Sequence, residues 1–185
     1  PKVSSERRQF IPIGYLDNNV ICGDKIFFVA DASLFTFGVL TSTMHIAWMR
    51  YTCGRLKSDY SYSNTIVYNN YPWPGFAGEP LSDKHRTAIE QAAQCVLDAR
   101  AQFADASLAD LYDPLTMPPA LLKAHQKLDA AVDAAYQPSG GKKSYASDAE
   151  RVAFLFELYQ RITSLLPAPA VKKTRKTTSE ERRTT

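Results

Sequence analysis

Three stretches in the second half of this 185-residue chain space their apolar side chains alternately three and four residues apart. They cover residues 89–103, 121–135 and 152–166. Side chains at this spacing lie on one face of an α-helix, so the pattern predicts three consecutive amphipathic helices. A helix with one apolar face needs another surface that buries it. We therefore expect a helical hairpin or a three-helix bundle over residues 81–166.

Residues that favour helix starts precede each of these stretches. Ser82 can cap the first helix, and Pro119 suits the first turn of the second because a first turn leaves its N–H groups unpaired. Ser147 and Glu150 have the spacing of a capping box at the start of the third. The start of each helix is therefore predicted from local sequence.

Residues 1–80 show a different pattern, in which short β-prone runs and prolines surround two short helical segments. The expected strands are residues 9–15, 20–22, 25–30 and 64–68, the second and third being joined by the tight-turn dipeptide Gly23-Asp24. The expected helix caps are Asp31 or Ser33 and Thr41 or Ser42, with Gly54 ending the second helix.

These patterns together predict an α+β fold with two units and a tail. A small mixed α/β unit occupies residues 1–80, the helical unit occupies residues 81–166, and residues 167–185 form a flexible basic tail. The net charge of +3 is concentrated in that tail, since residues 171–185 carry six cations and two anions. The folded part is nearly neutral, so any contact with nucleic acid must depend on local placement of charge.

The cysteines and histidines lie far apart in sequence and lack the spacing of a metal site. Cys22, Cys53 and Cys95 form no C-x-x-C pair, which indicates reduced thiols in a cytoplasmic protein. His125 falls on an apolar helical face, where a structural histidine is the ordinary outcome. No apolar run approaches the roughly 20 residues that span a bilayer, so no membrane contact is expected. The start at Pro1, without Met or a signal pattern, suggests a domain from a longer chain.

The segment from Arg50 to Pro74 mixes cations with aromatic rings. Basic side chains bind phosphates, and rings stack on bases or wedge between them, so this composition favours nucleic-acid contact. Arg50 has no carboxylate at helical spacing that would neutralise it. The cations are Arg50, Arg55 and Lys57, and the rings belong to Tyr51, Tyr60, Tyr62, Tyr68, Tyr71 and Trp73.

Lys57 and Asp59 are the most specific pair in this segment. In extended backbone, residues two apart project to the same side. Lysine donates to guanine O6 and N7 while a carboxylate accepts from cytosine N4, so the pair is complementary to a G·C base pair. A surface ion pair on a loop is the ordinary alternative, and such pairs contribute little to stability.

Several runs of the chain have a family resemblance. The first unit contains, in order, Phe10-Ile-Pro-Ile-Gly-Tyr-Leu, Gly38-Val-Leu-Thr-Ser-Thr-Met-His, Cys53-Gly-Arg-Leu-Lys-Ser-Asp-Tyr and Ser63-Asn-Thr-Ile-Val-Tyr-Asn-Asn-Tyr-Pro-Trp-Pro. These runs resemble the end of the target-recognition domain of MmeI-like enzymes. The second unit contains Leu108-Ala-Asp-Leu-Tyr-Asp-Pro-Leu-Thr-Met-Pro-Pro and Ala149-Glu-Arg-Val-Ala-Phe-Leu-Phe-Glu-Leu-Tyr, which resemble the C-terminal helical region of that family. The resemblance covers roughly residues 7–166.

MmeI-like enzymes are large single-chain bacterial proteins that methylate adenine in a short DNA site and often carry a nuclease. The resemblance implies that residues 1–80 are the C-terminal part of a DNA target-recognition domain. It implies double-stranded DNA and the remaining methyltransferase domains as partners, and S-adenosylmethionine as a cofactor of the longer protein. We interpret Lys57 and Asp59 as base-reading residues, and as DNA backbone or stacking residues Arg50, Arg55, Ser58, Tyr60 and Tyr62.

The chain by itself shows no catalytic or cofactor motif. Residues 69–74 hold the ingredients of an Asn-Pro-Pro-Tyr methylation motif in the wrong order, and no glycine-rich phosphate loop is present. We therefore expect no catalytic, cofactor-binding or metal-binding residue here, and no activity from this chain alone. In an alternative interpretation, the near-neutral helices form a protein-interaction or domain-docking module without direct DNA contact.

Overall fold

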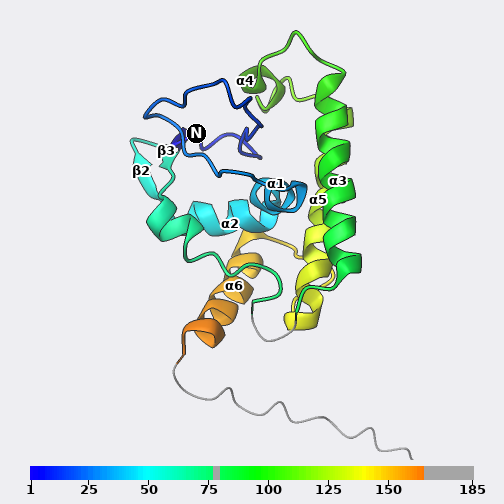
Figure 1. Cartoon of the computed structure of the whole chain (residues 1–185). Coiled ribbons are helices and arrows are strands. Elements are labelled where there is room, and N and C mark those ends of the chain that lie inside the picture. Colours follow the sequence, from blue (N-terminus) through cyan, green and yellow to red (C-terminus); the bar gives the residue numbers. More distant parts are fainter. Residues whose placement is uncertain (77–79, 165–185) are drawn as a thin grey trace, which may run out of the picture.

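Helices form most of the fold, and a small sheet lies beside the N-terminus (Figure 1). The structure is a computed structural model that describes residues 1–76 and 80–164. In chain order the elements are β1 Val3–Ser4, α1 Leu34–Thr41, α2 Thr43–Thr52, β2 Gly54–Leu56, β3 Asp59–Ser61, the π-helical turn η1 Asn64–Tyr68, α3 Asp83–Ala101, α4 Leu108–Leu111, α5 Pro119–Tyr136, the 3-10 turn η2 Gln137–Ser139 and α6 Asp148–Thr163. The predicted α+β class is confirmed.

The helices begin where local sequence predicts. The Oγ atoms of Ser33, Ser42, Ser82 and Ser147 each accept a hydrogen bond from the backbone N–H three residues later, at the starts of α1, α2, α3 and α6. The first residue of α5 is Pro119. The capping box before α6 differs in one bond, since the Glu150 carboxylate accepts from the N–H of Ala146 at 2.9 Å instead of that of Ser147.

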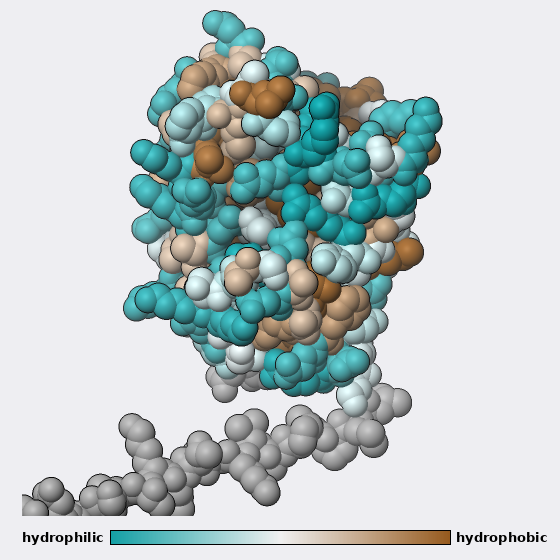
Figure 2. All heavy atoms as spheres, turned by 180° about the vertical axis from the view of Figure 1, so that it is seen from behind, coloured by the Kyte–Doolittle hydropathy of each residue, from teal (hydrophilic) through white to brown (hydrophobic). Residues whose placement is uncertain are grey.

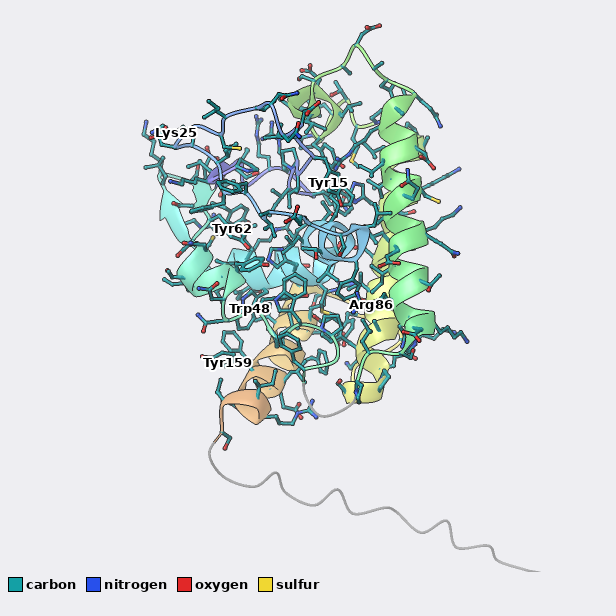
Figure 3. All side chains as sticks on the ribbon, viewed as in Figure 1. Tyr15, Lys25, Trp48, Tyr62, Arg86 and Tyr159 are labelled. Atoms are coloured by element: carbon teal, nitrogen blue, oxygen red, sulfur yellow. The ribbon has the colours of Figure 1, made fainter. Side chains whose placement is uncertain are left out.

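Antiparallel helices α3 and α5 form the predicted helical hairpin, and α1 packs across it (Figure 1). Helix α6 does not complete a three-helix bundle, because its apolar face packs on α2. The rings of Trp48 in α2 and Tyr159 in α6 lie 6.0 Å apart between these helices (Figure 3). One cluster of buried side chains therefore joins the N-terminal and C-terminal halves. The predicted boundary near residue 80 stays a prediction, and the predicted tail lies outside the described residues.

His125 in α5 is the structural histidine that the sequence predicts. Its ring stacks on Phe10 at 4.1 Å, and its Nε2 atom lies 2.7 Å from the hydroxyl of Tyr112. Burial, with the nearby Arg100 guanidinium as a second cause, lowers the pKa of His125 to about 3. The imidazole is therefore neutral at physiological pH and acts as a packed ring in the core.

The four strands that the sequence predicts are not formed. The sheet consists of β1, β3 and β2 in that spatial order, all antiparallel. In residues 9–15 the side chains of Phe10 and Ile11 both enter the core, which an alternating strand would not allow. Residues 64–68 turn as η1, because Ser63 caps them through the N–H of Ile66 and Val67 is buried. Residues 20–22 and 25–30 form irregular coil.

The rear surface of the molecule is mostly hydrophilic, with small separate apolar patches (Figure 2). Among residues 1–76 and 80–164, no helix is both long and apolar enough to cross a membrane.

Gly38 sets the distance between α1 and the α3–α5 hairpin. A Cβ atom at this position would lie 2.8 Å from Cγ2 of Ile89, 3.2 Å from Cβ of Ala93 and 3.3 Å from Cδ1 of Leu128. Real Cβ atoms essentially never approach to 2.8 Å, and 3.2 to 3.3 Å is tighter than most real contacts, so a larger side chain would force α1 or its neighbours to shift.

We expect Gly38→Leu to lower the free energy of unfolding by roughly 1 to 3 kcal/mol, because it overpacks the core at this crossing. Urea denaturation followed by circular dichroism measures the change. Gly23→Leu is the matched control, since no atom lies within 4 Å of a Cβ at Gly23. Equal stability of the two variants would contradict the assignment of Gly38 as the contact point.

Candidate nucleic-acid interface

An exposed hairpin carries most of the residues that the sequence singles out. Helix α2 ends at Thr52, where the N–H of Cys53 donates to the carbonyl of Met49 at 2.9 Å, and the chain enters β2 at once. In the β2–β3 pair, Arg55 faces Tyr60 and Leu56 faces Asp59. Residues 57 and 58 form the turn between the strands. The hairpin lies at the edge of the molecule, away from the α3–α5 pair (Figure 1).

Lys57 lies in the turn, with a φ of +57°. The expectation that Lys57 and Asp59 project to one side of an extended strand is therefore wrong, because a two-residue hairpin turn uses left-handed backbone. Lys57 is exposed and Asp59 is half-buried. In the described part of the chain no ion pair joins them, so they do not form the surface pair that was the alternative. Their base-reading role stays a prediction.

Arg55 is exposed but held in one direction. Its guanidinium lies 4.1 Å from the centroid of the Tyr60 ring, directly across the ladder. Its Nη1 atom donates to the carbonyl of Ser58 at 2.8 Å and lies 3.4 Å from Oε2 of Glu6. The side chain keeps 45% of its surface accessible. A cation that is preoriented and still exposed can contact a phosphate.

Arg50 is already engaged within the protein. Its Nη1 atom donates to Oδ2 of Asp148 at 2.5 Å, and its Nη2 atom donates to the carbonyls of Arg8 and Gln9, each at 3.1 Å. The sequence shows no neutralising partner because Asp148 is 98 residues away. Arg50 thus joins α2, the N-terminal segment and the start of α6. Its contact with DNA phosphate stays a prediction that this geometry does not favour.

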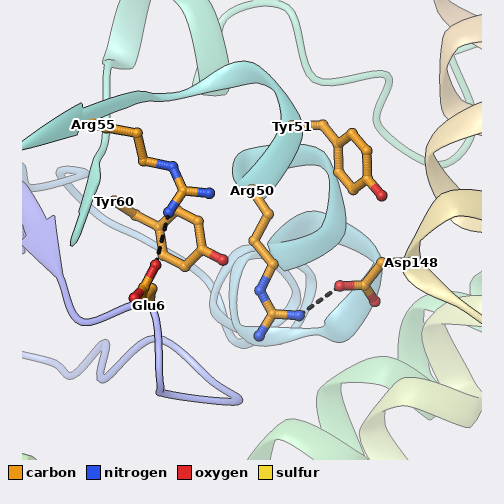
Figure 4. Close-up of a pocket in the computed structure, with 6 residues that line it drawn as sticks. All are labelled: Glu6, Arg50, Tyr51, Arg55, Tyr60 and Asp148. Carbon is orange, nitrogen blue, oxygen red and sulfur yellow. Dashed lines mark hydrogen bonds and ion pairs between the residues drawn. The ribbon is translucent and has the colours of Figure 1, made fainter. Parts of the chain in front are cut away.

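The two arginines line an open groove of 700 Å³ with Glu6, Tyr51, Tyr60 and Asp148 (Figure 4). Two cations and two carboxylates make its formal charge zero. A phosphate at Arg55 would compete with Glu6, whereas a phosphate at Arg50 would compete with Asp148, whose ion pair links the start of α6 to α2. Glu6 and Asp148 carry no local signal in the sequence, because both meet their arginines through tertiary contacts.

Tyr62, the residue after β3, links the hairpin to His45 of α2. Its hydroxyl lies 3.1 Å from Nε2 of His45, whose Nδ1 atom lies 2.9 Å from the carbonyl of Leu40. A carbonyl only accepts, so Nδ1 of His45 carries the proton, and Nε2 accepts from the Tyr62 hydroxyl. Burial raises the pKa of Tyr62 and lowers that of His45 to about 4. The half-buried Tyr62 ring fits this link better than stacking on a base, and the stacking role stays a prediction.

Of the remaining predicted contact residues, Tyr60 is half-buried beneath Arg55, and Ser58 is exposed in the turn. Five of the predicted contact residues thus lie on one hairpin: Arg55, Lys57, Ser58, Asp59 and Tyr60. Arg50 lies in α2 before the hairpin, and Tyr62 follows directly after β3. Residues 1–76 and 80–164 contain no group of three or more histidine, cysteine, aspartate or glutamate side chains placed to hold a metal ion.

The His45 contact makes stability depend on pH. The folded pKa of about 4 is depressed from 6.5, so this contribution is complete above pH 6.5 and is lost as pH falls towards 4. Between pH 7 and pH 5 we expect the free energy of unfolding to fall by about 2 kcal/mol more in the wild type than in His45→Gln. Urea denaturation at both pH values measures this.

The comparison between the two proteins is needed because Asp133 acts in the opposite sense. Desolvation outweighs the Arg151 ion pair and raises the pKa of Asp133 to about 6. Its contribution is common to both proteins and cancels in the difference. An equal fall in both proteins would show that His45 is not buried as a neutral ring.

Comparisons with known proteins match both halves of the chain. Residues 1–75 match the model of the family described as MmeI, target recognition domain, and residues 81–167 match that of MmeI, C-terminal domain. DNA methyltransferase A of Bacillus subtilis (strain 168) is 40% identical over 163 residues, which cover 88% of this chain and 17% of that protein.

A solved structure shares the fold. It is that of the type IIL restriction-modification enzyme MmeI in complex with DNA, with a TM-score of 0.81 and 50% sequence identity. The match covers 89% of this chain and 21% of that chain. The chain described here therefore spans about a fifth of the length of the relatives it matches.

Proposed function

This chain belongs to the MmeI family, and we propose that it is the DNA sequence-recognition part of a longer bacterial methyltransferase of the restriction-modification type. The observations that carry the proposal are the 50% identical match to MmeI in complex with DNA and the match of residues 1–75, which contain the hairpin, to the MmeI target recognition domain. An exposed hairpin with a lysine at its turn and a preoriented arginine beside it is suited to entering a DNA groove.

The chemistry of methylation belongs in this proposal to the rest of the longer polypeptide. We infer that this polypeptide transfers a methyl group from S-adenosylmethionine to the N6 atom of adenine, in the cytoplasm. The groove beside Arg55 holds two ion pairs and two tyrosine rings and has no nucleophile paired with a base, which supports recognition over catalysis for this chain. Methylation mapping by single-molecule sequencing of DNA treated with the complete protein tests the reaction.

Docking of the helices onto another protein is the weaker candidate. The apolar faces of α3 and α5 pack against each other and against α1, and α6 packs on α2. Most of this apolar surface is therefore used inside the chain, although Phe156 and Ile162 of α6 stay exposed. The C-terminal helices are better explained as the support that fixes α2, from which the hairpin emerges.

Arg55 is the cation whose loss should weaken binding to every DNA sequence. In Arg55→Ala we expect lower affinity for all duplexes by a similar factor, and a slope of log K against log salt that is smaller by about 1. Fluorescence anisotropy of labelled duplexes at several salt concentrations measures both. Lys127→Ala is the control, because Lys127 is exposed on α5, distant from the hairpin. Loss of affinity for only some sequences would instead make Arg55 a base-reading residue.

Lys57 and Asp59 should determine the choice at one base pair, with G·C preferred. A good bidentate contact is worth about 1 to 3 kcal/mol of discrimination, which corresponds to about tenfold or more. We expect Lys57→Glu with Asp59→Arg in the complete protein to shift preference at a single position towards C·G while the rest of the site stays selective. Sequencing of methylated sites measures the shift.

Lys57 is exposed in the turn, whereas Asp59 is half-buried at the start of β3, so the melting temperature of the double variant has to be compared with that of the unchanged protein. Normal folding with unchanged specificity would remove both residues from base reading.

A further inference from the structure

A second surface of the molecule is apolar and irregular, and it lies beside the sheet, where the rings of Phe27 and Tyr62 are 6.1 Å apart. Residues 15–29, here named the apolar coil, carry seven of the seventeen exposed large hydrophobic side chains in the described part of the chain. Ile21 is 96% exposed and Phe28 is 73% exposed. The members are Tyr15, Leu16, Val20, Ile21, Phe27, Phe28 and Val29. Such a density is unusual for a surface that faces only water.

The backbone of the apolar coil is also largely unpaired. Its sequence has the composition of two strands around a Gly23-Asp24 turn, yet it forms no strand. One backbone bond ties it to the sheet, from the N–H of Lys2 to the carbonyl of Lys25 at 2.9 Å. Within residues 1–76 and 80–164, the N–H groups of residues 27–29 have no hydrogen-bond acceptor. β-prone residues with free backbone groups are able to pair with another strand.

Charge argues against DNA as the occupant of this surface. The apolar coil contains two aspartates and one lysine, and this lysine, Lys25, is paired with Asp24 at 3.1 Å. Lys2, whose Nζ atom lies 4.9 Å from the centroid of the Phe27 ring, brings the formal charge at this surface to zero. An apolar surface without net positive charge does not attract a phosphate backbone.

We propose that the apolar coil is the docking surface for an extended, apolar segment elsewhere in the same longer polypeptide, with which residues 20–29 pair as strands. This inference rests on the proposed function, in which the chain works within a longer methyltransferase. The relatives extend far beyond the matched region, which covers 17% of one and 21% of the other. Lys25 marks the outer edge of the molecule at this surface (Figure 3), so the coil is open to an approaching segment.

Docking would supply backbone hydrogen-bond partners and a cover for exposed apolar side chains, both of which the coil lacks in this chain. Paired strands satisfy the N–H groups of residues 27–29, and the apolar segment covers the exposed side chains of Ile21 and Phe28. A neutral or basic partner segment would complement Asp17 and Asp24. Residues 1–76 would then be held at two places. Helices α1 and α2 pack on the C-terminal helices α3 and α6, and the apolar coil would pair with the docked segment.

Hydrogen–deuterium exchange with peptide resolution tests the inference by comparing the 185-residue chain with the complete methyltransferase. We expect the amides of residues 20–29 to exchange rapidly in the chain alone and on the order of tenfold or more slowly in the complete protein. Equal exchange in the two would overturn the inference. Slow exchange in the chain alone, together with dimers in light scattering, would assign the surface to a second copy and would also overturn it.

A double variant, Ile21→Asp with Phe28→Asp, shows whether the side chains take part. Both side chains are exposed, so the melting temperature of the chain alone should not change, whereas protection of residues 20–29 in the complete protein should be lost. Leu115→Asp is the matched control, since Leu115 is 91% exposed on another loop and should leave protection intact. Retained protection in the double variant would overturn the inference. The readout needs no DNA, so a failure of DNA recognition is seen separately in the anisotropy measurements.

Discussion

The indole of Trp48 is the contact on which the position of the hairpin depends. It is 2% exposed, and its Nε1–H donates to the carbonyl of Val67 at 3.1 Å, which satisfies a donor that burial would otherwise leave unpaired. Its ring lies 4.9 Å from Phe156 of α6 and 6.4 Å from Tyr71. Helix α2 is thereby fixed between α6 and the segment that follows the hairpin. Since β2 starts two residues after α2 ends, the direction of the hairpin follows from the burial of this one helix.

The helix starts that were predicted correctly from sequence depend on neighbours within four residues. A serine that accepts from the N–H three positions later sets a helix start whatever surrounds it, and α3 shows this at Ser82. Strand formation depends on a partner that is often distant in sequence. The β-prone residues 20–30 therefore form a coil, while the distant Val3 and Ser4 pair with one edge of β3 and the neighbouring β2 pairs with the other. Tertiary context also overrides propensity at residues 64–68, where burial of Val67 beneath Trp48 favours a helical turn.

The candidate site also combines features that follow from nearby residues with features that depend on residues distant in sequence. Composition singles out Arg55 and Tyr60, but it does not predict their contact across the β2–β3 ladder, because no strand is expected from the sequence at residues 54–61. The ion pair of Arg50 with Asp148 could not be predicted, since it requires α6 to return to α2 after 98 residues. The turn conformation of Lys57 could not be predicted either, because Lys57-Ser58 contains no glycine or asparagine to mark left-handed backbone.

Arg50 and Arg55 are five residues apart and serve different parts of the molecule. Arg50 is 21% exposed and has an ion pair and two carbonyl partners, so its loss would leave Asp148 without its cation at the junction of three segments. Arg55 is 45% exposed and is shared between Glu6 and the π-face of Tyr60, which are weak partners in water. A surface that has to bind a polyanion and then release it needs cations that, like Arg55, are exposed and only weakly held by other groups. The half-buried Arg50–Asp148 pair holds the hairpin in place, and this leaves the tip free to vary without cost to the core.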